Sequence, residues 1–246
     1  MWLPGVKRLP PSPPHQLLPR VIAITGCDGA GKSTLSEDLA ARLHTTESVQ
    51  WLYLGQSSGN IARWIRNLPV IGPSLGRHLV TRAGKSHGEQ NAAPDTATIL
   101  TIYLLSQWRA HKFRRMLRLN RRGVVVVTDR YPQAEVSGFH FDGAGLGVVK
   151  LESWLARRLA AHEQRLYLWM ASHVPALVIR LNIDAETAHL RKPDHRMSML
   201  RDKVAVIPGL QFNGARIVDL DGRDPYQQLL DTAVSAASAA IREPAE

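Results

Sequence analysis

Five short apolar stretches recur along the chain, and each is rich in valine, isoleucine or leucine. Continuous apolar runs of this kind are typical of strands that are buried on both faces of a sheet. Segments with a helical spacing of apolar residues separate them, and this alternation predicts an α/β fold with a parallel sheet between two helical layers. The expected strands are Arg20–Thr25, Gln50–Leu54, Gly123–Thr128, Ala176–Ile183 and Ala215–Leu220.

The helical segments complete this expected three-layer arrangement. Residues 55–93 are polar and interrupted by glycines, and we interpret them either as a mobile region that covers a substrate or as a surface excursion. Ligands of parallel α/β sheets bind beyond the carboxyl ends of the strands, so we expect the functional site at that edge. The expected helices are Lys32–Leu43, Asp95–Arg121, Gly147–Ser172, Asp184–Lys192, Asp194–Val206 and Asp224–Ile241.

The first expected strand runs directly into a glycine-rich loop. The loop reads Gly26, Cys27, Asp28, Gly29, Ala30, Gly31, Lys32, Ser33 and Thr34. This is the G-x-x-x-x-G-K-S pattern of the phosphate-binding P-loop, in the strand–loop–helix context that the motif requires. Glycine permits the backbone to wrap its amides around phosphate oxygens, and the helix N-terminus adds its positive dipole. We expect Lys32 to reach the β- and γ-phosphates of a nucleotide and Ser33 to bind Mg²⁺.

The third expected strand ends in a charged pair, Asp129 and Arg130, followed by Tyr131. A carboxylate at this strand end lies near the P-loop, so Asp129 is a second candidate for holding Mg²⁺, often through water. Arg130 is suited to a two-pronged contact with an acceptor phosphate or carboxylate. The alternative is a structural Asp–Arg pair that caps the strand, but the upstream P-loop favours the functional interpretation.

Composition narrows the class of protein. The chain has 246 residues, 44% of them hydrophobic, which fits one globular domain with an ample core. Cys27 is the only cysteine, which excludes an intrachain disulfide and suits a reducing cytoplasm. No apolar run reaches the length of a membrane span. Residues 1–19 are rich in proline and lack the apolar core of a signal peptide, so we expect a flexible extension before the folded domain.

The net charge of +10 is concentrated in two places, residues 108–122 and 189–203. Positive charge gathered near a P-loop favours a small acidic substrate over nucleic acid. In the second cluster Pro193 interrupts a helix, and this predicts a lid over residues 189–203 that brings cations onto a transferring phosphoryl group. A solvated helix turn is the alternative. In the first cluster we interpret the basic residues other than Arg109 as a solvated helix face.

In this order, the motifs resemble those of the thymidylate kinase family of nucleoside-monophosphate kinases. The resemblance covers most of residues 20–241 and implies a P-loop kinase domain over residues 20–246. It implies transfer of the γ-phosphoryl group of ATP, with Mg²⁺, to an acidic small molecule such as a nucleoside monophosphate. Family members are often dimers, so it also implies a homodimer. The matching stretches are Gly26–Thr34, Leu104–Arg109, Gly123–Tyr131 and Pro175–Asp184, which runs on into Arg191 and Lys192.

The resemblance assigns roles to individual residues. The family carries an acidic residue where Asp28 stands, an Asp-Arg-Tyr where residues 129–131 stand, and a helical arginine where Arg109 stands. Gly29 occupies a position where one subgroup has arginine, so the chain is more similar to the subgroup that supplies this charge from its lid. The resemblance assigns catalytic roles to Lys32, Asp28, Arg130 and Arg191, and ATP binding to the P-loop together with Arg191 and Lys192. It assigns acceptor binding to Asp28, Leu105, Arg109, Arg130 and Tyr131. It assigns Mg²⁺ binding to Ser33 and Asp129.

The acceptor side departs from the family pattern. No proline-flanked arginine follows the second strand, where the chain reads Gly55-Gln56-Ser57-Ser58, and Leu105 stands where the family often has a phenylalanine. A nucleoside monophosphate remains the preferred acceptor. A hydroxyl-bearing nucleoside, sugar or glycan precursor is the alternative, with Asp28, Asp129 or Glu135 as its base. A nucleotide-hydrolysing switch without an acceptor is a further alternative.

Overall fold

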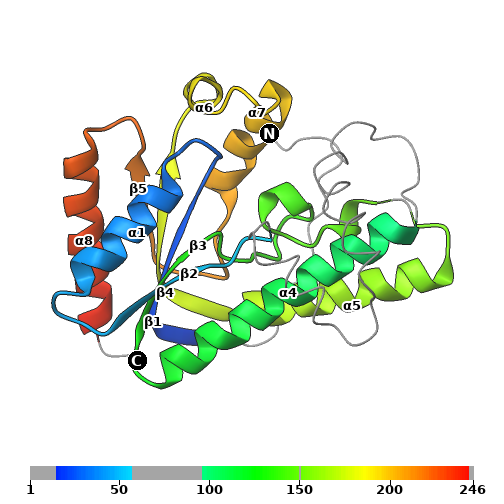
Figure 1. Ribbon diagram of the computed structural model, residues 1–246, viewed down its shortest axis with the longest axis horizontal. Coiled ribbons are helices and arrows are strands. Elements are labelled where there is room, and N and C mark those ends of the chain that lie inside the picture. Colours follow the sequence, from blue (N-terminus) through cyan, green and yellow to red (C-terminus); the bar gives the residue numbers. More distant parts are fainter. Residues whose placement is uncertain (1–14, 57–95, 150, 244–246) are drawn as a thin grey trace, which may run out of the picture.

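The computed structural model describes residues 15–56, 96–149 and 151–243 (Figure 1). The described residues form a five-stranded sheet in the order β2-β3-β1-β4-β5, and every neighbouring pair of strands is parallel. Helices cover both faces, so the predicted α/β three-layer sandwich is confirmed. The strands are β1 Gln16–Gly26, β2 Val49–Tyr53, β3 Val125–Asp129, β4 His173–Asn182 and β5 Ile217–Asp221.

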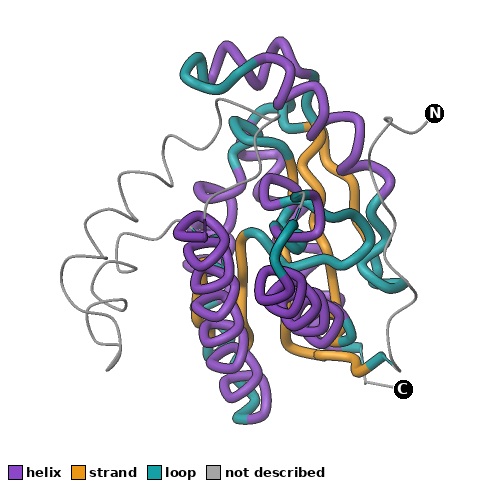
Figure 2. Tube along the Cα trace, turned by 90° about the vertical axis from the view of Figure 1, so that its right-hand side faces the viewer, coloured by secondary structure: helices purple, strands orange, loops and turns teal. Residues whose placement is uncertain are grey.

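Two pairs of long helices form the outer layers. Helices α1 (Lys32–Leu43) and α8 (Tyr226–Arg242) pack on one face of the sheet. Helices α4 (Thr96–Arg121) and α5 (Trp154–Ala171) pack on the other, and Figure 2 looks onto this layer. The short helices α6 (Ala185–Arg191) and α7 (Met197–Val206) follow β4 and lie at the top of Figure 1. Three 3₁₀ turns complete the described elements: η1 Phe139–Phe141, η2 Leu146–Val148 and η3 Ile207–Gly209.

The central strand explains why the strand sequences are continuously apolar. Ile22 and Ile24 point into the core beneath α1 and α8, whereas Val21 and Ala23 point into the core beneath α4 and α5. Successive side chains of a strand point to opposite faces, so a strand with helices on both sides needs apolar residues at every position. The edge strand β5 is only half-buried, as its position in the sheet requires.

Several element boundaries differ from the sequence-based expectation. β1 begins at Gln16 rather than Arg20, and the pairing of Gln16 with His173 extends the sheet through residues that we had expected in the flexible extension. The register of β1 against β4 shifts between Leu18 and Ile22, across Pro19, which has no N–H to donate to the ladder. The rest of the expected extension, residues 1–14, and nearly all of residues 55–93 lie outside the described residues.

The helix α5 begins at Trp154, later than the predicted Gly147. Ser153 accepts a hydrogen bond from the Ala156 amide and caps the helix, while the preceding residues form η2. The serine cap satisfies one of the unpaired amides of the first turn and sets the start of the helix. None of the described helices combines the length and the apolar character that a bilayer span requires.

Candidate functional site

The glycine-rich loop turns sharply between β1 and α1. Gly26 has φ +151°, and a Cβ there would lie 2.6 Å from the Leu181 carbonyl oxygen of the neighbouring strand. Gly31, which precedes the first residue of α1, has φ +93°. Both backbone conformations favour glycine, and the second turns the chain into the helix. The unpaired amides of the first turn of α1 are therefore presented at the carboxyl edge of the sheet, as phosphate binding requires.

Lys32 folds back over this loop. Its ammonium is buried and donates a hydrogen bond to the Cys27 carbonyl at 2.8 Å. Burial lowers the pKa of Lys32, and the charge of Arg130 lowers it further, while Asp129 and Asp28 oppose the shift. An anion placed in the loop would offset both unfavourable effects, because it would pair with the buried ammonium and screen it from Arg130.

Ser33 at the start of α1 and Asp129 at the end of β3 bring two oxygen groups together. The Ser33 hydroxyl donates to Asp129 Oδ2 at 2.9 Å, and Asp129 is 0% exposed. Its other oxygen, Oδ1, is buried and accepts no hydrogen bond from any described residue. Burial raises the pKa of Asp129, although Lys32 and Arg130 pull it down. A buried carboxylate oxygen with unused lone pairs, beside a hydroxyl, fits Mg²⁺, which prefers oxygen ligands.

No cluster of three or more histidine, cysteine, aspartate or glutamate side chains gathers within the described ranges. Mg²⁺ usually keeps several water molecules and completes its shell with substrate phosphates, so one carboxylate and one hydroxyl are a sufficient protein contribution. The residues at the end of β3 and the start of α1 therefore fit this ion.

Asp28 is the centre of a group of cations. Arg130 donates to Asp28 Oδ1 at 2.8 Å, and the ammonium of Lys203 in α7 contacts Oδ2. His195 Nδ1 lies 3.8 Å from the same Oδ2. Burial on its own would raise the pKa of Asp28, but the charges of Lys203, Lys32 and Arg130 outweigh it and hold the pKa well below its ordinary value. Asp28 is therefore a poor proton acceptor in this arrangement.

Sequence reasoning did not single out Lys203. It lies at the end of the expected lid, 5% exposed, on the buried face of α7 that it shares with Leu200 and Val206. A lysine at an apolar position of an amphipathic helix was the available signal, because such a charge is buried only when it is paired. Its partner lies 175 residues away in the chain, and no local pattern identifies it.

Arg130 has an unusual backbone. Its φ is +62°, in the left-handed region, and its amide donates to the Ile24 carbonyl of β1 at 3.2 Å. A non-glycine residue is held there only when its surroundings demand it. The result is that the half-buried guanidinium turns toward the P-loop, between Asp28 and the ring of Tyr53.

The other residues that the family resemblance assigns to the acceptor lie in the interior. Arg109 is 1% exposed and its guanidinium contacts the Arg130 carbonyl, the Asp142 carboxylate at 3.2 Å and the Tyr167 hydroxyl at 3.4 Å. It therefore braces the turn after β3. Tyr131 is buried, and its hydroxyl donates to the His173 carbonyl at 2.6 Å. Leu105 is also buried.

The expected lid lies against the P-loop. The Arg191 guanidinium donates to the Gly29 carbonyl at 3.3 Å and to the Gly222 carbonyl at 3.0 Å. A Cβ on Gly29 would lie 2.9 Å from the Ala188 carbonyl oxygen, so glycine permits this close approach of α6. Lys192 directly follows α6 and Arg196 directly precedes α7, and both are exposed.

One basic residue of α4 departs from the expected solvated face. Arg114, Arg115 and Arg118 are exposed, as the pattern predicted. Lys112 instead turns inward, and its ammonium contacts the Gly55 carbonyl just beyond β2. The prediction of a solvated side chain is wrong for this residue, because the helix places it one turn after Arg109 on the side that faces the sheet edge.

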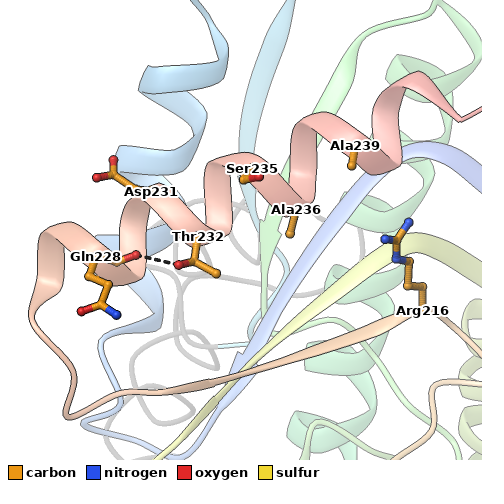
Figure 3. A pocket seen from close by; sticks show the side chains of 7 residues that line it. All are labelled: Arg216, Gln228, Asp231, Thr232, Ser235, Ala236 and Ala239. Atoms are coloured by element: carbon orange, nitrogen blue, oxygen red, sulfur yellow. Dashed lines mark hydrogen bonds between the residues drawn. The ribbon is translucent and has the colours of Figure 1, made fainter.

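One hollow lies away from the candidate site, and a small cavity lies beside it. A shallow hollow runs along α8 and contains none of the candidate residues (Figure 3). Beside the P-loop, Gly26, Arg130, Asp142 and Lys203 line a cavity of about 10 Å³, which is room for about one water molecule. Side chains therefore leave little space at this point beside the P-loop. The hollow along α8 is lined by Arg216, Gln228, Asp231, Thr232, Ser235, Ala236 and Ala239.

Two proteins of Escherichia coli K12 resemble this chain over nearly its whole length. The "Uncharacterized ATP-binding protein YghS" is 49% identical over 222 residues, which span 90% of this chain and 94% of that protein. The "Uncharacterized ATP-binding protein YghR" is 40% identical over 227 residues, which span 92% of this chain and 90% of that protein. No protein-family model matches the chain.

Proposed function

This chain belongs to the family of the ATP-binding proteins YghS and YghR, and we propose that it is an ATP-dependent phosphotransferase that acts on a small anionic acceptor. The observation that carries the proposal is the P-loop together with the Ser33–Asp129 pair at the carboxyl edge of the sheet. A phosphate-binding loop next to a buried carboxylate with a free oxygen is the arrangement that binds a nucleoside triphosphate with Mg²⁺.

The P-loop binds the triphosphate of ATP in this proposal. The backbone amides at the start of α1 face the phosphate oxygens, and the Lys32 ammonium exchanges the Cys27 carbonyl for the β- and γ-phosphates. Ser33 and Asp129 would hold Mg²⁺, which when bound neutralises developing charge on the β- and γ-phosphate oxygens. Each of these residues lies in or directly beside the loop, so binding requires no rearrangement of the sheet.

Phosphoryl transfer depends mostly on positioning and on neutralising negative charge. Arg191 already lies on the P-loop through Gly29, so it is placed to contact the triphosphate. Lys192 and Arg196, which are both exposed, are free to close over the group in transfer. Arg130, on the other side of Asp28, faces the acceptor.

The carboxylates near the loop favour an acceptor that is already ionised. A hydroxyl acceptor would benefit from a carboxylate base. Asp28 is held by Lys203 and Arg130, and its lowered pKa makes it a poor base. Asp129 accepts from Ser33, and Glu135 accepts from the Gln211 amide at 2.9 Å. A phosphate acceptor needs no such base near neutral pH, so a nucleoside monophosphate or a similar phosphate monoester suits the site best.

An acceptor screen tests this function. ATP consumption by the purified protein, with Mg²⁺, should rise several-fold with a nucleoside monophosphate and not with the matching nucleosides or sugars. Lys32→Ala should abolish the stimulated rate and leave thermal unfolding nearly unchanged, whereas the control Arg42→Ala, on the exposed side of α1, should keep the rate. Turnover that no acceptor stimulates, or that survives Lys32→Ala, would refute the proposal; stimulation by a hydroxyl compound alone would redirect it to the alternative acceptor class.

A further inference from the structure

We infer that Lys112 and Arg130 together form the subsite that binds the phosphate group of the acceptor, at the carboxyl ends of β2 and β3. This inference rests on the proposed phosphotransferase function and specifies where the acceptor binds and which group of the acceptor is recognised. It shifts the anion contact from Arg109, which is committed to the interior, to a lysine one turn further along α4.

Lys112 and Arg130 lie at the same edge of the sheet, each close to Gly55. Tyr53, the last residue of β2, is the register partner of Asp129, the last residue of β3. Gly55 follows β2 and Arg130 follows β3, so both residues lie beyond the same edge of the sheet. The Lys112 ammonium contacts the Gly55 carbonyl, although it comes from α4. Elements far apart in the chain therefore bring two cations to neighbouring strand ends.

Both cations lie near the ring of Tyr53. Lys112 Nζ is 5.0 Å from the ring centroid, and the guanidinium carbon of Arg130 is 6.0 Å from it. A Cβ on Gly55 would lie 2.2 Å from the Tyr53 hydroxyl and 2.7 Å from Arg130 Cδ, so these groups are in close contact. The aromatic face favours a cation only weakly. It positions the ammonium without neutralising it.

Among the described residues, cations outnumber carboxylates at this edge of the sheet. Within the described ranges Lys112 forms no ion pair, and the hydrogen bond of its ammonium to Gly55 uses one of three donors. Arg109 pairs with Asp142, and Arg130 shares Asp28 with Lys203. The Nε of Arg130 is buried and donates to no described residue. Partly buried cations that outnumber their acids and keep spare donors are stabilised by a bound anion.

The ionisation of Lys112 supports the same conclusion. Burial, and then the charge of Arg109, lower its pKa to about 7. In the part of the chain that the structure describes, the groups near its ammonium are Arg109 and Trp108 from its own helix and Tyr53 from β2, and none of them is a carboxylate. Arg130 lies over the same Tyr53 ring. A phosphate dianion would raise the pKa again by pairing with the ammonium. Binding of a phosphate monoester at neutral pH should therefore take up protons.

Site-resolved amine labelling tests the subsite without any turnover. The protein is acetylated at pH 8 and the modification of Lys112 is followed by mass spectrometry, with thymidine monophosphate, adenosine monophosphate or inorganic phosphate as probes. The matched nucleosides serve as uncharged controls. We expect each monophosphate to slow the labelling of Lys112 at least fivefold, and the nucleosides to leave the rate unchanged. Equal rates with every probe at millimolar concentration, or equal protection by nucleosides, would overturn the inference.

Acceptor kinetics supply a second test. Lys112→Met should raise the acceptor KM at least tenfold with the KM for ATP unchanged, and Lys112→Arg should recover most of the loss. The control Arg115→Met removes an exposed cation from the same helix and should change neither value. An unchanged acceptor KM in folded Lys112→Met would overturn the inference. If monophosphates protect Lys112 but stimulate no ATP consumption, the subsite stands and the phosphotransferase function fails; if they stimulate ATP consumption but leave Lys112 unprotected, the function stands and the subsite fails.

Discussion

The buried ion pair between Lys203 and Asp28 predicts a large loss of stability when one partner is removed. The two side chains are 5% and 7% exposed, so Lys203→Met keeps most of the packing volume in α7 but leaves a buried carboxylate. Breaking a buried pair costs about 3–5 kcal/mol. Arg130 still contacts Asp28 at 2.8 Å in the variant, which reduces the expected cost to about 2–3 kcal/mol in the free energy of unfolding.

Urea unfolding followed by tryptophan fluorescence measures this loss, and a double-mutant cycle isolates the pair. Asp28→Asn alone leaves Lys203 buried without an acid, so it should also destabilise, whereas the double variant should recover at least about 1 kcal/mol relative to additivity. For a chain of this size each kcal/mol corresponds to about 2–4 °C in the melting temperature, so Lys203→Met should melt roughly 4–12 °C lower. A change below about 0.5 kcal/mol, or an additive cycle, would refute the assigned pairing.

The pH dependence of the same variant gives an independent check. The unfolded chain binds a proton at Asp28 near the ordinary pKa of 3.8, whereas the folded protein holds this pKa lower. The stabilisation by the pair is therefore complete above the ordinary value and is lost as the pH falls below it toward the folded-state pKa. The stability difference between the wild-type protein and Lys203→Met should be constant from about pH 5 to 7 and shrink below about pH 4.

Two further predictions concern the metal site and the core. Asp129→Asn should abolish Mg²⁺-dependent ATP turnover and leave the melting temperature equal or higher, because it removes a buried charge; retained turnover, measured by coupled ATP consumption, would contradict the role of Asp129. Tyr131→Phe should lower the free energy of unfolding by about 1–2 kcal/mol, because the His173 carbonyl loses its partner, with the acceptor KM unchanged; a raised KM would place Tyr131 in the acceptor site.

Much of the fold follows from local sequence. The central strand β1 is recognisable in the sequence, because burial on both faces requires an apolar residue at every position. Residues Val21–Ile24 are all apolar and all buried. The turn at Gly26–Lys32 is recognisable because its backbone angles exclude most residues. The predicted boundaries of the elements were less accurate. Pairing with β4 extends β1 back to Gln16, and the Ser153 cap starts α5 later in the chain than predicted.

Some residues of the candidate site could also be predicted from the sequence, whereas the placement of others could not. The P-loop residues are consecutive, so the order of residues alone predicts that they act together. Asp129 was predicted from its position at a strand end, and the structure brings it to Ser33. The roles of Arg109 and Tyr131 depend on which side of the helix and strand faces the core, and the structure places both in the interior. A family resemblance predicts which residue stands at a position, but whether that side chain is buried is known only from the tertiary structure.

The layered architecture and the phosphate-binding loop can be predicted from the chain alone, because both depend on residues that are neighbours along it. The pairing of distant charges depends on tertiary packing instead. Lys203 reaches Asp28 across 175 positions, and Lys112 reaches Gly55 across 57. Whether a lysine lies in water or against a buried partner depends on how whole helices pack, and the packing of α4 and α7 places Lys112 against Gly55 and Lys203 against Asp28.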